Sequence, residues 1–139
     1  MRLIDTCEII RLFEDKQEKE LLNSDIAVCS FNEEELLYLE HRHKIDVRLR
    51  HKMKKFFVDN KIPIIPVPVT PGQRKEEKRY VDSVNKNLLR LIPDPSDAVL
   101  AACALQHNAN IVTRDRHHLY TAKLENLFQE NGISVSKKI

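Results

Sequence analysis

The sequence predicts an α/β fold with three layers, α/β/α, built around a central parallel sheet of four to five strands. Short apolar segments alternate along the chain with longer segments of helical periodicity, which is typical of parallel strands joined by right-handed crossovers. The chain has only two glycines in 139 residues, which excludes glycine-rich linkers and phosphate-binding loops. This length accommodates one hydrophobic core, so we expect a single domain over residues 1–139.

In the N-terminal half, the apolar pattern sets the expected elements. These are a short strand at 2–6, a helix at 8–22, a buried strand at 26–30, and a helix from 32 to about 59 with an optional break near Lys44. Apolar residues such as Ile9 and Phe13 give the first helix one apolar side. Asn32 is expected to cap the second helix, with Glu35 three residues later in the position of a capping box.

In the C-terminal half, prolines and one glycine punctuate the chain. Three prolines confine the apolar run at 62–69 to a short or edge strand. Asp94 and Pro95 make a good helix start, and Gly132 is expected to follow the end of the last helix. The expected elements are helices at 74–91, 97–107 and 122–130 and strands at 110–113 and 133–135.

Four acidic residues occur where a predicted strand ends or a predicted helix begins: Asp5, Glu35, Asp97 and Asp115. In a parallel sheet these points lie along one edge, where binding sites form. Clustered carboxylates repel one another and raise one another's pKa, so such a cluster needs compensation. A hard divalent cation with oxygen ligands provides it, and Mg²⁺ or Mn²⁺ bound there suits phosphodiester hydrolysis.

Each of these acids also has an ordinary structural explanation. Asp5 is a suitable helix N-cap, and Glu35 fits the capping box. Asp97 lies in the first turn of a helix, where an acid is favourable, and a metal-binding role is compatible with that position. Asp115 is an ordinary turn residue on this view, and Asp94 is a weaker candidate ligand.

The chain resembles the PIN-domain family of metal-dependent ribonucleases. The resemblance rests on three segments: Leu3-Ile4-Asp5-Thr6, the alanine-rich helix that Asp97 opens, and the strand ending in Thr113-Arg114-Asp115. It implies that Asp5, Asp97 and Asp115 hold the principal metal ion. Glu35 would complete the shell or position the attacking water, with Thr6 and Thr113 orienting carboxylates from behind. The products would carry a 5′-phosphate and a 3′-hydroxyl.

Basic residues are candidates for RNA contacts. Arg114 and Arg116 adjoin Asp115 and are placed to hold the scissile phosphate, and His118 is a weaker candidate for the metal or a phosphate. The segment 41–55 is also strongly basic. It either contacts the RNA backbone or is simply the solvated face of a helix. The net charge of +2 means that any attraction to nucleic acid must come from such local patches.

Composition narrows the compartment and the class of chemistry. Cys7, Cys29 and Cys103 have no paired spacing and are expected to be buried, reduced thiols. No apolar run is long enough to span a membrane, so a cytoplasmic protein is expected. The histidines show no zinc spacing backed by cysteines.

The cellular role has several candidates. Resemblance to small, single-domain family members implies a VapC-like toxin of a type II toxin–antitoxin pair, with RNA as substrate, an antitoxin protein as partner and a homodimeric state. A role in ribosomal-RNA processing and a catalytically silent RNA-binding PIN domain are the alternatives. A phosphoryl-accepting receiver-like domain is disfavoured, because Asp5 lacks an adjacent acid and Asp115 stands where a lysine is needed.

Overall fold

The computed structural model describes residues 1–38, 45–114 and 121–139 and contains a five-stranded sheet in which every pairing is parallel. The strand order is β3-β2-β1-β4-β5, with β1 in the centre. The strands are β1 (Arg2–Ile4), β2 (Ile26–Cys29), β3 (Ile64–Ile65), β4 (Asn110–Val112) and β5 (Val135–Ser136). Arg2 pairs with Ile26 on one side and with Asn110 on the other, so the three central strands are in register.

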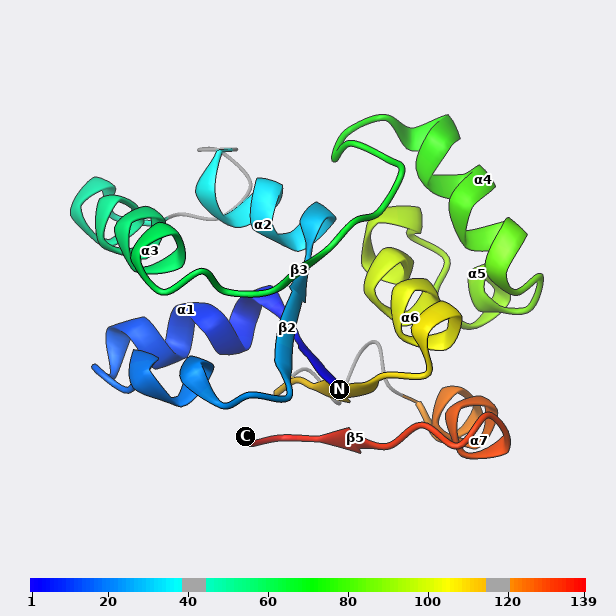
Figure 1. Cartoon of the computed structure of the whole chain (residues 1–139). Coiled ribbons are helices and arrows are strands. Elements are labelled where there is room, and N and C mark those ends of the chain that lie inside the picture. Colours follow the sequence, from blue (N-terminus) through cyan, green and yellow to red (C-terminus); the bar gives the residue numbers. More distant parts are fainter. Residues whose placement is uncertain (39–44, 115–120) are drawn as a thin grey trace.

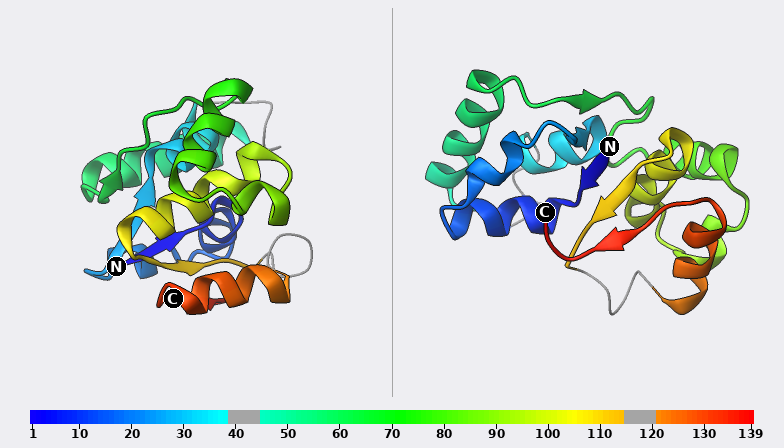
Figure 2. Two further views of the ribbon diagram at one scale, coloured as in Figure 1. Left: turned by 90° about the vertical axis from the view of Figure 1, so that its right-hand side faces the viewer. Right: turned by 60° about the horizontal axis from the view of Figure 1, so that its bottom comes forward.

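Helices cover both faces of the sheet (Figures 1 and 2), which confirms the predicted three-layer architecture. They are α1 (Thr6–Glu14), the 3-10 helix η1 (Glu18–Leu22), α2 (Ser30–Leu37), α3 (Val47–Asp59), α4 (Arg74–Val84), α5 (Leu88–Leu91), α6 (Pro95–His107) and α7 (Ala122–Glu130). Strand side chains alternate between two separate cores. Leu3 packs into the core beneath α4, α6 and α7, whereas Ile4 packs into the core beneath α1, α2 and α3.

Three predicted helices are shorter or begin elsewhere. The helix expected at 8–22 is divided into α1 and η1, because the chain turns at Lys16, which adopts a φ of 57°. The helix expected at 74–91 is divided into α4 and α5 by Asn85, whose backbone is extended. The second helix begins at Ser30, so Asn32 lies within its first turn and does not cap it.

Most remaining elements agree with the sequence prediction, although the first strand ends at Ile4 and the last strand is Val135–Ser136, not 133–135. The proline-rich run forms only the two-residue strand β3, at the edge of the sheet. Pro95 opens α6, and the Asp94 side chain caps it by accepting a hydrogen bond from the Ser96 amide at 2.9 Å. Helix α7 has the predicted bounds, and Thr121 caps it. The helix expected from 32 to about 59 is two helices, since α2 ends at Leu37 and α3 begins at Val47; Lys44 itself lies outside the described residues.

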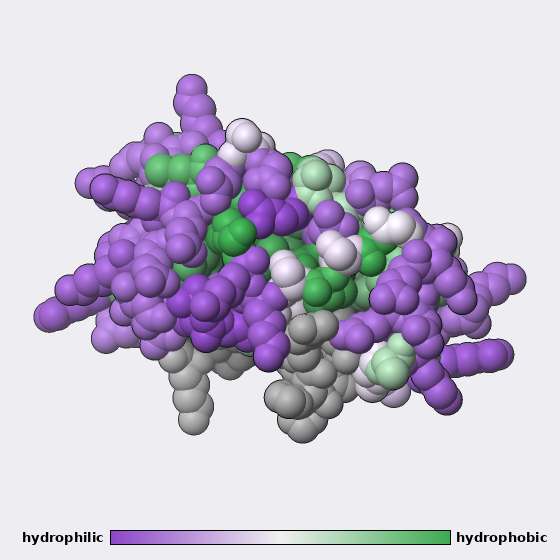
Figure 3. All heavy atoms as spheres, turned by 90° about the horizontal axis from the view of Figure 1, so that it is seen from below, coloured by the Kyte–Doolittle hydropathy of each residue, from purple (hydrophilic) through white to green (hydrophobic). Residues whose placement is uncertain are grey.

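The surface is mostly hydrophilic. Seen from below the view of Figure 1, hydrophobic atoms show in the middle of the face, between hydrophilic flanks (Figure 3). In the part of the chain that the structure describes, none of the helices is long and apolar enough to cross a membrane. All three cysteines are free, but Cys7 is exposed, because it lies on the outer side of α1; the prediction that all three are buried was wrong for this residue.

Candidate functional site

Three of the predicted site residues, Asp5, Asp97 and Thr113, lie at the carboxyl edge of the sheet. Helices α1 and α2 follow β1 and β2 directly, so Asp5 and the first turn of α2 lie at this edge. Helix α6 leads into β4, which runs parallel to β1, so α6 must begin at the same edge, where Asp97 lies in its first turn. Thr113 follows the last residue of β4.

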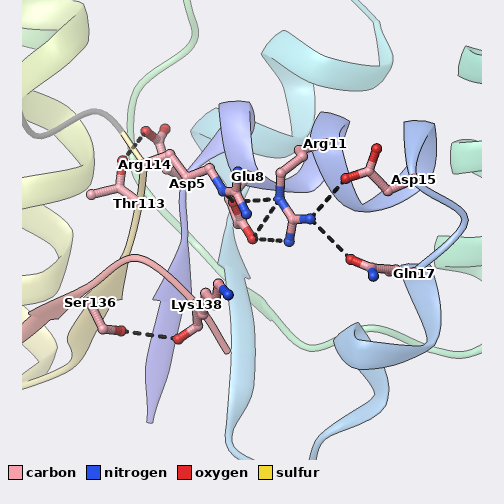
Figure 4. A network of polar contacts seen from close by, with 9 residues as sticks. All are labelled: Asp5, Glu8, Arg11, Asp15, Gln17, Thr113, Arg114, Ser136 and Lys138. Carbon is pink, nitrogen blue, oxygen red and sulfur yellow. Dashed lines mark hydrogen bonds and ion pairs between the residues drawn. The ribbon is translucent and has the colours of Figure 1, made fainter.

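Asp5 occupies the N-cap position of α1, but its carboxylate does not cap the helix. Instead, the hydroxyl of Thr113 donates a hydrogen bond to Asp5 Oδ2 at 2.7 Å (Figure 4). Thr113 is fully buried, so protein atoms surround its hydroxyl and restrict its orientation. This contact joins residues 108 positions apart in the sequence and fixes one oxygen of Asp5 against the end of β4.

Thr6 is held by a residue that the sequence did not identify as part of the site. The side-chain amide of Asn32 donates to Thr6 Oγ1 at 2.8 Å, and the Cys29 thiol donates to Asn32 Oδ1 at 2.5 Å. The neighbouring Cys103 thiol, together with burial, raises the pKa of Cys29, which keeps this thiol protonated and able to donate. Asn32 is buried, but the sequence around it indicated only a helix cap and carried no signal for this contact.

A second contact ties the start of α2 to the segment after β3. The Val67 amide donates to Ser30 Oγ at 2.8 Å. Together with the Asn32–Thr6 and Thr113–Asp5 hydrogen bonds, this contact links segments that follow β3, β2, β1 and β4 along the carboxyl edge. Side-chain hydrogen bonds therefore stabilise this edge in addition to the backbone hydrogen bonds of the sheet.

Glu35 and Asp97 lie on the two helices that flank this edge. Glu35 is buried, with 9% of its surface exposed, in α2. It does not form the predicted capping box, because Asn32 is not the cap and bonds to Thr6. Asp97 is exposed, and Asp94 performs the capping of α6, so the start of this helix does not need the Asp97 side chain as a cap.

Arg114 is engaged with the protein. Its Nε lies 3.0 Å from Glu8 Oε2, and Glu8 is fully buried although it carries a carboxylate. Arg11 binds the same carboxylate, with its Nη2 donating to Glu8 Oε1 at 2.6 Å (Figure 4). Glu8 raises the pKa of Arg11, which keeps this guanidinium group a cation. The Glu8–Arg114 pair lies next to the Thr113–Asp5 hydrogen bond and braces the same junction between β4 and α1.

A family model of the PIN domain matches residues 2–124. The chain belongs to the PIN domain family. No curated protein and no solved structure matches it significantly. PIN domains are generally nucleases, so family membership indicates a hydrolase that acts on nucleic acids.

PIN nucleases commonly use divalent metal ions, and the donors at this edge suit such an ion. Asp5, Glu35 and Asp97 offer only carboxylate oxygens, which hard cations prefer. Within residues 1–38, 45–114 and 121–139, no three His, Cys, Asp or Glu side chains lie close enough together to hold a metal. The fourth predicted acid, Asp115, lies outside these ranges, as do Arg116 and His118.

The basic segment 41–55, which the sequence leaves as either an RNA contact or a solvated helix face, continues into α3, and several cations of α3 contact other parts of the chain. Arg50 is buried. Lys52 Nζ lies 3.0 Å from Glu18 Oε1, and Lys54 Nζ lies 5.0 Å from the centre of the Tyr38 ring. These contacts fasten α3 to η1 and α2 and leave fewer of its charges directed to solvent.

Proposed function

We propose that this PIN domain is an endoribonuclease that depends on Mg²⁺ or Mn²⁺. The observation that carries the proposal is the position and hydrogen bonding of the Asp5 carboxylate. Its carboxylate lies at the carboxyl edge of the sheet and is oriented by the Thr113 hydroxyl, not consumed in capping α1. Asp97 lies in the first turn of α6, which begins at the same edge, and Glu35 lies buried on α2.

In this proposal, Asp5, Asp97 and Asp115 hold the metal ion, and Glu35 completes the shell or positions the attacking water. A bound divalent ion lowers the pKa of its water and neutralises charge on the phosphate. Thr113 keeps one Asp5 oxygen in a fixed direction. Asn32 holds Thr6 and thereby the first turn of α1, which limits reorganisation when the ion and the RNA bind.

The test is a pair of matched substitutions at the start of α6. Asp97→Asn removes one ligand charge while α6 keeps its Asp94 cap, so cleavage of RNA at saturating concentration should fall by orders of magnitude. Asp94→Asn makes the same chemical change three residues away and retains a good capping residue. Its turnover should stay within a few-fold of wild type.

Activity should also vanish with EDTA and return with added Mn²⁺. Circular dichroism would establish that both variants are folded. Undiminished turnover by folded Asp97→Asn would refute the metal-site assignment.

The resemblance to VapC-like toxins supports a narrower proposal for the cellular role. We propose that the chain forms a homodimer and is held inactive by a small antitoxin protein. Co-expression with the product of an adjacent short reading frame, followed by size-exclusion chromatography and a cleavage assay, tests this role. A stable complex that no longer cuts RNA is expected. Cleavage that is confined to ribosomal-RNA precursors, with no such partner, would instead favour the RNA-processing role.

A further inference from the structure

A basic hollow of about 360 Å³ lies where the start of α4 meets the segment that leads into α6. Its lining residues are Arg74, Lys75, Lys78, Pro93 and Pro95. All three polar residues in this lining are cations, and all three are exposed. Pro95 opens α6 two residues before Asp97, so the hollow lies at the end of α6 that carries this proposed metal ligand.

Arg74 is held in place from the α6 side. Its Nη1 donates to Asp94 Oδ1 at 3.1 Å and to Ser96 Oγ at 3.0 Å. Behind these groups lies Glu77, which is fully buried and accepts hydrogen bonds from the Ser96 hydroxyl and, at 2.8 Å, from the Gly72 amide. Arg74 is therefore pre-positioned at the edge of the hollow by the same residues that begin α6.

Lys75 and Lys78 supply the charge that is available to a ligand. Neither makes an ion pair within the part of the chain that the structure describes. Successive helix residues are about 100° apart, so Arg74, Lys75 and Lys78 share one side of α4, whereas Glu76 points to the opposite side. The acids that contact this cluster are Asp94 and Glu77, and both engage Arg74.

We infer that this hollow binds backbone phosphates of the RNA strand that flanks the scissile bond on the Asp97 side. The inference rests on the proposed nuclease function, whose substrate must extend beyond the metal site. Proteins bind single-stranded nucleic acid through positively charged grooves that follow the backbone. The hollow provides such a positively charged surface at the start of α6, whereas α3 directs part of its charge to contacts within the chain.

The experiment compares two double variants that remove equal charge. Lys75→Gln/Lys78→Gln removes the two lysines of the hollow. Lys19→Gln/Lys86→Gln removes two exposed lysines, on η1 and in the α4–α5 turn, that lie outside it. Binding of a short unstructured RNA is measured by fluorescence anisotropy over a range of salt concentrations. EDTA is present throughout, because it prevents cleavage during the titration.

Loss of two phosphate contacts should reduce the slope of log affinity against log salt by about 1.4, since each contact contributes about 0.7 for single strands. The control pair should keep the wild-type slope. In cleavage assays, the Lys75/Lys78 variant should show a raised KM and an almost unchanged kcat. With a single-stranded DNA of the same sequence, the Lys75/Lys78 variant should show the same reduction in salt slope, because the phosphates of DNA and RNA are equivalent.

Equal salt slopes for the two double variants, or no detectable binding of RNA by the wild-type chain, would overturn the inference. This outcome is separable from failure of the proposed function. A wild-type chain that binds RNA but does not cut it with Mg²⁺ or Mn²⁺ contradicts the nuclease proposal, while the slope comparison still decides whether the hollow binds phosphates.

Discussion

Replacing Glu8 by glutamine should destabilise the fold more than any nearby surface change. Glu8 is fully buried and receives Arg11 Nη2 at 2.6 Å and Arg114 Nε at 3.0 Å. Removing one partner of a buried ion pair costs about 3–5 kcal/mol. Here the side chains of Arg11 and Arg114 retain 19% and 44% exposure, so water can solvate the charges left behind. We therefore expect a loss of about 2–3 kcal/mol, nearer the value for charge-assisted hydrogen bonds.

For a domain of this size, that loss corresponds to a fall in Tm of about 6–12 °C. The matched control is Asp15→Asn, which removes the exposed partner of Arg11 at 3.0 Å and should cost less than about 1 kcal/mol. Urea unfolding of both variants, followed by circular dichroism, gives the comparison. Equal midpoints for Glu8→Gln and Asp15→Asn would show that the buried carboxylate does not brace the junction between α1 and β4.

Three further perturbations address the site and the pH dependence. Thr113→Val keeps the side-chain volume but removes the hydroxyl that orients Asp5. Calorimetry should therefore show an affinity for Mn²⁺ that is reduced by about 10–100-fold. An unchanged affinity would contradict the orienting role of Thr113. Saturating Mn²⁺ should raise the wild-type Tm by binding only the folded state, and Asp5→Asn should blunt that shift; a flat titration counts against the site. Arg2 lowers the pKa of Asp25, so their pair should stabilise the fold at neutral pH and lose this effect as the pH falls below about 3.9. The difference between wild type and Asp25→Asn in urea should therefore shrink in acid, and a constant difference would refute the linkage.

The sequence was sufficient for the fold class because that class depends on local patterns. Buried β-branched runs and helical periodicity determine the order of elements, and this order implies a parallel sheet. The start of α6 was also predictable, since Asp94 and Pro95 act within one turn of each other. Placement of Asp5 and Asp97 at one edge follows from the same topology, without knowledge of any side-chain contact.

The supporting contacts could not be predicted because they join distant segments. Asn32 and Glu35 have the local spacing of a capping box, but β2 runs directly into α2, and the Asn32 amide is satisfied by Thr6, 26 residues earlier. The burial of Glu8 was likewise not evident from its position in the sequence. Only the return of the chain in β4 brings Arg114 to it and makes burial of its charge tolerable.

The contacts around the carboxyl edge also indicate how arginines can lie near the carboxylates assigned to the metal without forming ion pairs with them. Asp5 receives its hydrogen bond from the neutral hydroxyl of Thr113, so its negative charge is oriented but not neutralised by this contact. Arg114, the residue after Thr113, is paired with Glu8 in the first turn of α1. Arg74 is likewise held by Asp94, which leaves Asp97 outside that pair. Arg114 and Arg74 are thus paired with acids other than those assigned to the metal. Exchanging the partners, with Arg114 on Asp5, would satisfy the same number of charges but would make metal binding compete with an internal ion pair.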